Sequence, residues 1–186
     1  FSPSPSEKML KITKNIERAQ YHFDYLNKKI NLNDIESFVD VGGGEGAFIK
    51  TLKNNLNNAK EFYLVEPSDI YREFAISNNS CDGAFESIEQ IPNTNKTRLI
   101  SMIHVLEHII DPVKFLRQLS KSMNLGDYIF IDVPNVFKYW HVSEVHIAHT
   151  NHFNIDTLSK ALEESNFKIL DVGEHSPIRH PKSVRG

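Results

Sequence analysis

The chain has 186 residues, of which 40% are hydrophobic and 24% are charged, and 21 Lys and Arg against 24 Asp and Glu give a net charge of −3. This length favours one globular domain over two, and the slight acidic excess makes a nucleic-acid partner unlikely. A single cysteine, Cys81, excludes an intramolecular disulfide, so a cytoplasmic protein is expected. No apolar run approaches the ~20 residues that span a bilayer, so we expect no membrane partner. Because the sequence begins with Phe1 and not with Met, we expect it to be a segment excised from a longer protein. The oligomeric state is left open.

A helix is predicted at the beginning of the chain. The opening SPSE places Ser4 as its N-cap and Pro5 at its first helical position. Apolar residues at helical spacing continue to Ile30. This spacing is interrupted near Ala19, where we expect the helix to break. Residues 1–33 are therefore interpreted as an N-terminal helical cap.

Short apolar stretches then alternate with helical patterns. They predict strands at residues 38–41, 62–65, 99–103, 128–133 and 168–172, and helices at residues 47–56, 113–122 and 154–166. Strands spaced by roughly 25 to 35 residues suit parallel pairs joined by crossover helices. The predicted fold class is α/β: a Rossmann-like, doubly wound, mainly parallel sheet with helices on both faces. Residues 34–133 would form its cofactor-binding core, residues 134–154 a long acceptor-side loop, and residues 155–186 a C-terminal helix, strand and tail, all within a single domain.

A glycine-rich loop joins the first predicted strand to the next helix. It contains Gly42, Gly43, Gly44 and Gly46. Glycines at such a junction let the backbone turn tightly and approach a ligand, and the following helix presents unpaired N–H groups. The run also satisfies the dinucleotide fingerprint, which keeps a nicotinamide-dependent oxidoreductase open as an alternative.

Two acidic residues flank this loop and bear on the choice of cofactor. Asp40 lies two residues before Gly42, where a carboxylate suits a cation better than a pyrophosphate. S-adenosylmethionine carries an ammonium and a sulfonium and no phosphate, so this charge pattern favours it. Glu66, at the tip of the next strand, can accept hydrogen bonds from both ribose hydroxyls. The structural alternative is a turn-capping Asp40 and an exposed strand-end Glu66.

Four motifs in a fixed order carry a resemblance. DVGGGEG, LVEPS, ISMIHVLEHIIDP and IFIDVPN resemble the motifs of class I S-adenosylmethionine-dependent methyltransferases, over residues 38–172. The chain is similar to the small-molecule group of ubiquinone-type O-methyltransferases and bacterial sugar methyltransferases. The resemblance implies S-adenosylhomocysteine as the product and a cofactor site across the carboxyl ends of the first four strands. That site would consist of Asp40, Gly42, Gly43, Gly44, Gly46, Glu66, Pro67, Ala84, Phe85, His104 and Val105. The family's last two strands form a hairpin, and here no clear seventh strand is seen.

The segment HVLEH is the source of the predicted catalytic residues. His104 and His108 would share a helical face with Glu107 beside them. Methyl transfer requires a nucleophile in line with the sulfonium and a base whose pKa is near neutral, which histidine satisfies. We therefore predict these three residues as catalytic, with a His general base. The alternative is that they only cap the helix and hold the turn after it.

The long loop after the strand predicted at residues 128–133 is rich in histidines and aromatic residues. Tyr139, Trp140, His146 and His149 are predicted to line an acceptor pocket. Histidines three apart could bind zinc, but no Cys and only Glu144 accompany them, so no metal is expected. The predicted function is methyl transfer from S-adenosylmethionine to a small polar acceptor. An oxygen of a sugar or of another biosynthetic intermediate is the favoured target, and a carbon or nitrogen target stays open. A non-catalytic cofactor-binding or partner subunit with the same fold is a further alternative.

Overall fold

The computed structural model describes residues 5–56, 60–139 and 148–175. The helices are α1 (Pro5–Lys29), α2 (Ala47–Asn55), α3 (Asp69–Ser77), α4 (Pro112–Ser122) and α5 (Ile155–Glu163), and the strands are β1 (Ser37–Val41), β2 (Glu61–Val65), β3 (Gly83–Phe85), β4 (Arg98–Ile103) and β5 (Tyr128–Asp132). These ranges also contain four short 3-10 helices, η1 (Leu32–Asp34), η2 (Ile88–Gln90), η3 (Leu106–His108) and η4 (Val136–Lys138). The predicted N-cap Ser4 lies outside the described residues.

The five strands form one parallel sheet in the order β3-β2-β1-β4-β5. In its register, Asp40 of β1 lies between Leu64 of β2 and Ser101 of β4. The strand order reverses direction between β1 and β4, and ligands of such sheets bind in the crevice outside the carboxyl ends of the strands at this point. The predicted α/β class is confirmed, and the predicted strands at 38–41, 62–65, 99–103 and 128–133 match the observed strands to within one residue.

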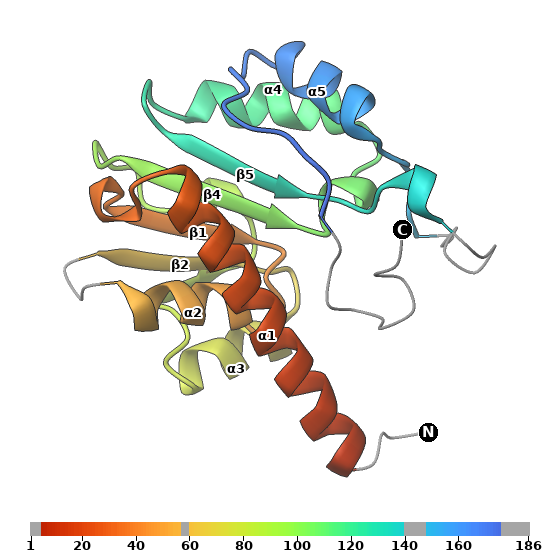
Figure 1. Ribbon diagram of the computed structural model, residues 1–186. Coiled ribbons are helices and arrows are strands. Elements are labelled where there is room, and N and C mark those ends of the chain that lie inside the picture. Colours follow the sequence, from red (N-terminus) through yellow and green to blue (C-terminus); the bar gives the residue numbers. More distant parts are fainter. Residues whose placement is uncertain (1–4, 57–59, 140–147, 176–186) are drawn as a thin grey trace.

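Helices cover both faces of the sheet (Figure 1). On the face covered by α1 and α2, Phe38 packs with Ile49 and other buried apolar side chains. On the face covered by α4 and α5, the next residue of β1, Val39, packs with Leu116 and Ala161. Successive strand residues point to opposite faces, so both faces of β1 are buried, and all five of its residues are buried.

Helix α1 differs from the expectation because it is unbroken over its 25 residues. Where the apolar spacing is interrupted, Ala19 and His22 are 3% and 2% exposed. They continue the buried face of the helix to Phe23 and Leu26. These positions follow the i, i+3, i+4, i+7 spacing of one helical face. A histidine therefore occupies a position in the stripe where an apolar residue is usual, and this hid the continuity of the pattern.

The strand predicted at residues 168–172 is wrong. This segment is irregular, and Leu170 and Val172 in it are 63% and 43% exposed. Side chains rather than a backbone ladder hold it, because Lys29 Nζ lies 2.8 Å from Asp171 and the Tyr25 hydroxyl also donates to that carboxylate. Within the described ranges, β5 is thus an edge of the sheet.

A helix that spans a membrane needs about 20 predominantly apolar residues. None of the helices in the described ranges combines the length and the apolar character that crossing a bilayer requires.

Candidate active site

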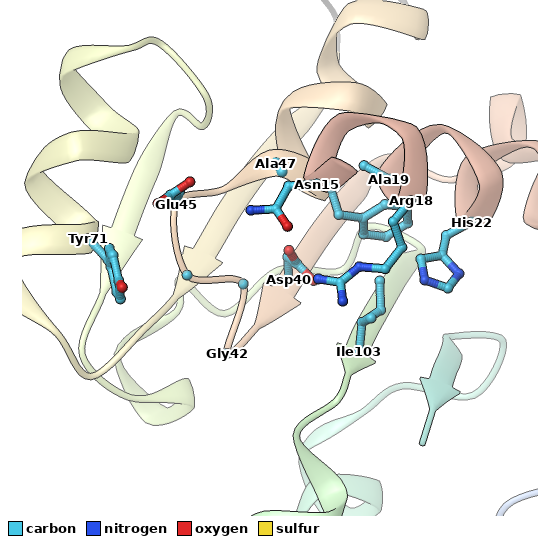
Figure 2. Close-up of a pocket in the computed structure, with 13 residues that line it drawn as sticks. Asn15, Arg18, Ala19, His22, Asp40, Gly42, Glu45, Ala47, Tyr71 and Ile103 are labelled. Atoms are coloured by element: carbon cyan, nitrogen blue, oxygen red, sulfur yellow. The ribbon is translucent and has the colours of Figure 1, made fainter. Parts of the chain in front are cut away.

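A cavity of about 190 Å³ opens at the carboxyl ends of β1 and β4, beside α1 (Figure 2). It lies at the reversal of strand order, where the fold predicts a ligand. Its lining residues come from α1, β1, the glycine loop, α2, α3 and β4: Asn15, Arg18, Ala19, His22, Asp40, Gly42, Gly43, Gly44, Glu45, Ala47, Phe48, Tyr71 and Ile103.

The glycine loop is pressed against its neighbours at two positions. Gly42 has φ +67°, and a Cβ there would lie 2.5 Å from Val105 Cγ2. A Cβ on Gly43 would lie less than 3.0 Å from both Asp40 and Leu64. Only glycine fits at these two positions without a shift of the surroundings. At Gly44 the space is open, so the backbone is exposed to the cavity.

Gly46 has a different place from the other three glycines. It adopts the left-handed conformation at the N-cap of α2 and is not among the residues that line the cavity. Its role in the described structure is to start the helix. Of the predicted glycines, the structure therefore brings Gly42, Gly43 and Gly44 to the cavity.

Asp40 is a buried carboxylic acid in the wall of this cavity. It is 2% exposed, and its Oδ1 accepts a hydrogen bond of 2.7 Å from Ser101 Oγ. Burial raises the pKa of Asp40 to about 7, although the Ser101 hydrogen bond and the charge of Arg18 act to lower it. The guanidinium of Arg18 points toward Asp40 (Figure 2). Asp40 therefore already faces a cationic group inside the cavity.

Glu66 follows β2 and ties the glycine loop to the next turn. Its Oε2 accepts from the Gly44 N–H at 3.0 Å, and its Oε1 accepts from the Ser68 N–H at 3.1 Å. Each carboxylate oxygen has two lone pairs, so both can accept a further donor. Glu66 reaches the cavity only through Gly44 and is not itself a lining residue. The other predicted cofactor residues outside the glycine loop that do not line the cavity are Pro67, Ala84, Phe85, His104 and Val105. Ala84 and Phe85 lie within β3 rather than after it.

The predicted catalytic residues come together directly after β4. His104 has φ +56°, an uncommon conformation for a residue with a side chain. Its Nδ1 is 3.3 Å from Glu107 Oε1, and the same oxygen is 3.9 Å from His108 Nε2. Glu107 is 1% exposed. The segment forms the 3-10 helix η3 rather than an α-helix, but it still places the carboxylate between the two imidazoles.

A second group of titratable side chains adjoins His104, and the sequence analysis did not single it out. Asp132, at the end of β5, has Oδ1 2.8 Å from His175 Nε2, and its Oδ2 lies 3.4 Å from His22 Nε2 and 3.8 Å from His104 Nε2. Two signals could have indicated it: Asp132 ends a strand next to β4, and His22 interrupts an apolar helix stripe. His175 lies in a segment without a recognisable pattern.

Burial and mutual contact set the protonation of this second group. Burial is the main cause that lowers the pKa of His22 to about 4, so its imidazole is neutral near pH 7. Burial would raise the pKa of Asp132, but the hydrogen bond from His175 and the nearby histidines outweigh it and lower the pKa. That hydrogen bond also raises the pKa of His175. Asp132 is thus the anionic centre of the group.

The predicted acceptor-side residues are only partly placed. The ring centroid of His149 is 4.8 Å from that of His108. The hydroxyl of Tyr139 is 3.4 Å from His152 Nδ1. Neither Tyr139 nor His149 lines the described cavity. Trp140 and His146 lie outside the described residues.

Solved structures share this fold at low sequence identity. The mitomycin 7-O-methyltransferase MmcR has a TM-score of 0.61 at 17% identity, over 84% of this chain and 48% of that protein, so the chain spans about half of its length. A methyltransferase from Archaeoglobus fulgidus, described as dependent on S-adenosylmethionine, has a TM-score of 0.64 at 19% identity over 83% and 69% of the two chains. The plantazolicin methyltransferase BamL, solved with S-adenosylhomocysteine, has a TM-score of 0.65 at 13% identity over 86% and 64%.

Sequence comparisons gave one family match. No curated protein sequence matches the chain. A family model described as "Methyltransferase domain" matches residues 11–172, which include the glycine loop, the five strands of the sheet, and His22, His104 and Asp132. This match decides against the nicotinamide-dependent oxidoreductase. The chain belongs to the methyltransferase domain family.

Proposed function

We propose that this domain binds S-adenosylmethionine in the cavity at the glycine loop and transfers its methyl group to an oxygen of a small polar acceptor, with His104 as the general base. The observation that carries the cofactor assignment is the buried carboxylic acid of Asp40 in the wall of that cavity. The names of similar structures, a mitomycin O-methyltransferase and a plantazolicin methyltransferase, support a small-molecule acceptor.

The residues present fit this cofactor. A carboxylate in the cavity wall attracts an ammonium or a sulfonium, whereas it would repel the phosphates of a dinucleotide. The open space at Gly44 lets a ligand approach the backbone, and Glu66 beside it keeps lone pairs for ribose hydroxyls. If the cofactor's ammonium takes the place beside Asp40, the Arg18 guanidinium is in position to bind the cofactor's carboxylate.

His104 is the best-placed group to accept a proton from the acceptor. S-adenosylmethionine supplies an electrophilic methyl group, so the chain itself needs only to position the acceptor and to remove its proton. Ile103, the residue before His104, lines the cavity. The buried Glu107 carboxylate, 3.3 Å from Nδ1, orients the imidazole and stabilises the positive charge that the imidazole gains when it accepts the proton.

Turnover in an acceptor screen tests this assignment. The formation of S-adenosylhomocysteine would be followed with sugars and phenols as acceptors, for the wild type, His104→Ala and Glu107→Gln. A general base contributes about 10²- to 10⁴-fold, so we expect His104→Ala to lower kcat by at least about 100-fold while S-adenosylhomocysteine affinity is kept. Glu164→Gln, on the exposed end of α5, is the matched control for Glu107→Gln.

Two outcomes would contradict the proposal. An unchanged kcat in His104→Ala would remove this residue as the base. Binding of S-adenosylmethionine without methylation of any acceptor would favour the second candidate function, a cofactor-binding partner subunit.

A further inference from the structure

Three residues that are far apart in the sequence converge on one point beside the cavity. His22 comes from α1, Asp132 from the end of β5, and His175 from the C-terminal segment. One ligand-type atom from each lies within 4.8 Å of those of the other two. The side chains of His22 and Asp132 are 2% and 8% exposed, whereas that of His175 is 23% exposed. The group is therefore enclosed, with one member near the surface.

Several atoms of this group face each other without forming a hydrogen bond. Among the residues that the structure describes, the buried atoms His22 Nε2, His104 Nε2 and Asp132 Oδ2 have no hydrogen-bond partner. Yet His22 Nε2 is 3.4 Å and His104 Nε2 is 3.8 Å from Asp132 Oδ2. Buried polar atoms are nearly always paired, and an exception calls for an explanation such as a bound ion.

We propose that His22, Asp132 and His175 bind a divalent cation of the zinc type. Imidazole nitrogens and a carboxylate oxygen are ligands that zinc accepts, and three protein ligands with one open position are typical of its catalytic sites. Bond lengths of 2.0–2.2 Å place two tetrahedral ligands about 3.4 Å apart, and the pairs formed by Asp132 with His22 and His175 are separated by 3.4 and 2.8 Å. Small side-chain adjustments suffice to surround an ion.

A second possible metal group is less suitable. Glu107, His108 and His149 also offer ligand atoms within 4.8 Å of one another. However, His108 is 43% exposed, and its Nδ1 is 2.9 Å from the Ala148 carbonyl oxygen. Its Nε2 is 3.9 Å from Glu107. The group around Asp132 is more buried and its pairs are closer, so it is the one we assign.

The position of the ion would link it to the acceptor side. His22 lines the cavity, and His104 adjoins Asp132. The open coordination position can thus take an oxygen ligand near the proposed base, a role that rests on the proposed function. The binding of the cation does not depend on that function, because it follows from the three side chains alone.

Metal binding can be measured directly on the whole chain. Protein freed of metal by a chelator is titrated with Zn²⁺ against a competing indicator dye, and with Co²⁺, whose visible absorption reports tetrahedral coordination. We expect one Zn²⁺ per chain with submicromolar affinity, and a loss of at least about 100-fold in His175→Ala and in His22→Ala. His175→Ala removes a partly exposed side chain of a terminal segment, so it keeps the fold even if His22→Ala does not.

The second group provides the matched control. His108→Ala is expected to bind Zn²⁺ as the wild type does. The proposal is overturned if the wild type binds no Zn²⁺ at micromolar concentration, in which case the three residues form only a hydrogen-bonded cluster. It is equally overturned if His108→Ala loses the metal and His175→Ala keeps it. Failure of S-adenosylmethionine to bind would leave both metal readouts unaffected, so the two proposals fail separately.

Discussion

The two sides of the site are built in different ways. On the glycine-loop side, the polar side chains are already paired with the protein: Asp40 with Ser101, and Glu66 with two backbone N–H groups. Around Asp132, imidazoles and carboxylates lie side by side, and several of their buried atoms have no hydrogen-bond partner in the described part of the chain. We call the first side, formed by the glycine loop with Asp40 and Glu66, the cradle. Its polar groups are already hydrogen-bonded within the protein, whereas the group around Asp132 contains buried polar atoms that a ligand or ion can bind.

The largest effect on cofactor binding is expected where the cradle is tightest. In Gly43→Ala, the new methyl group would collide with Asp40 and Leu64. Overpacking of this kind costs about 1–3 kcal/mol of unfolding free energy, and the displaced loop should no longer bind S-adenosylhomocysteine. Denaturant unfolding and calorimetric titration measure both effects. Gly173→Ala is the control, since a Cβ there meets open space; equal effects of the two substitutions would show that the loop is not tightly packed.

The stability of the cradle should depend on pH through Asp40. Its pKa in the fold, about 7, lies above the ordinary value of 3.8, so the fold is disfavoured once this carboxyl ionises. Stability is therefore full below about pH 4 and falls as the pH rises toward 7. Asp40→Asn should remove this loss and raise the unfolding free energy at pH 8 by roughly 2–4 kcal/mol, with no gain at pH 4. A pH-independent difference between the two proteins would contradict the assignment.

A smaller effect is expected at Glu66. Glu66→Gln keeps one acceptor oxygen but replaces the other by an NH₂ group, which cannot accept from Gly44 or from a ribose hydroxyl. The loss of a hydrogen bond to a charged group is worth about 1.5–3 kcal/mol, so we expect cofactor affinity to fall by about tenfold or more. Glu61→Gln, at the opposite end of β2 in a half-exposed pair with Lys96, is the control. Equal affinities in both variants would exclude Glu66 from the cofactor site.

The cradle could be predicted from the sequence because its parts are local. Asp40 and the glycines lie within seven consecutive residues of the chain, and the strand before them is recognisable by its apolar run. The clustering of His104, Glu107 and His108 could also be predicted from their short spacing, although the helix type could not. Short-range patterns thus identified the strands and the residues that directly follow them.

The group around Asp132 could not be predicted in the same way. His22 and His175 are brought together only because α1 packs on the sheet and the C-terminal segment returns past it, held by contacts such as Lys29 with Asp171. The same contacts explain the wrongly predicted strand at residues 168–172, whose apolar residues resemble a strand pattern but have no hydrogen-bonded neighbour in the described sheet. Asp132 and His22 each leave a local signal, but the proximity of the three residues has no signature in a single sequence.

Cofactor binding beside Asp40 is tested by calorimetric titration of S-adenosylmethionine and S-adenosylhomocysteine into the wild type and Asp40→Asn at pH 8, where the Asp40 carboxyl is ionised. We expect one site per chain with an affinity of about 1–100 µM, weakened at least about tenfold in Asp40→Asn, while the control Glu164→Gln binds as the wild type does. Equal binding by the wild type and Asp40→Asn, or no binding by the wild type, would rule out the proposed cofactor site.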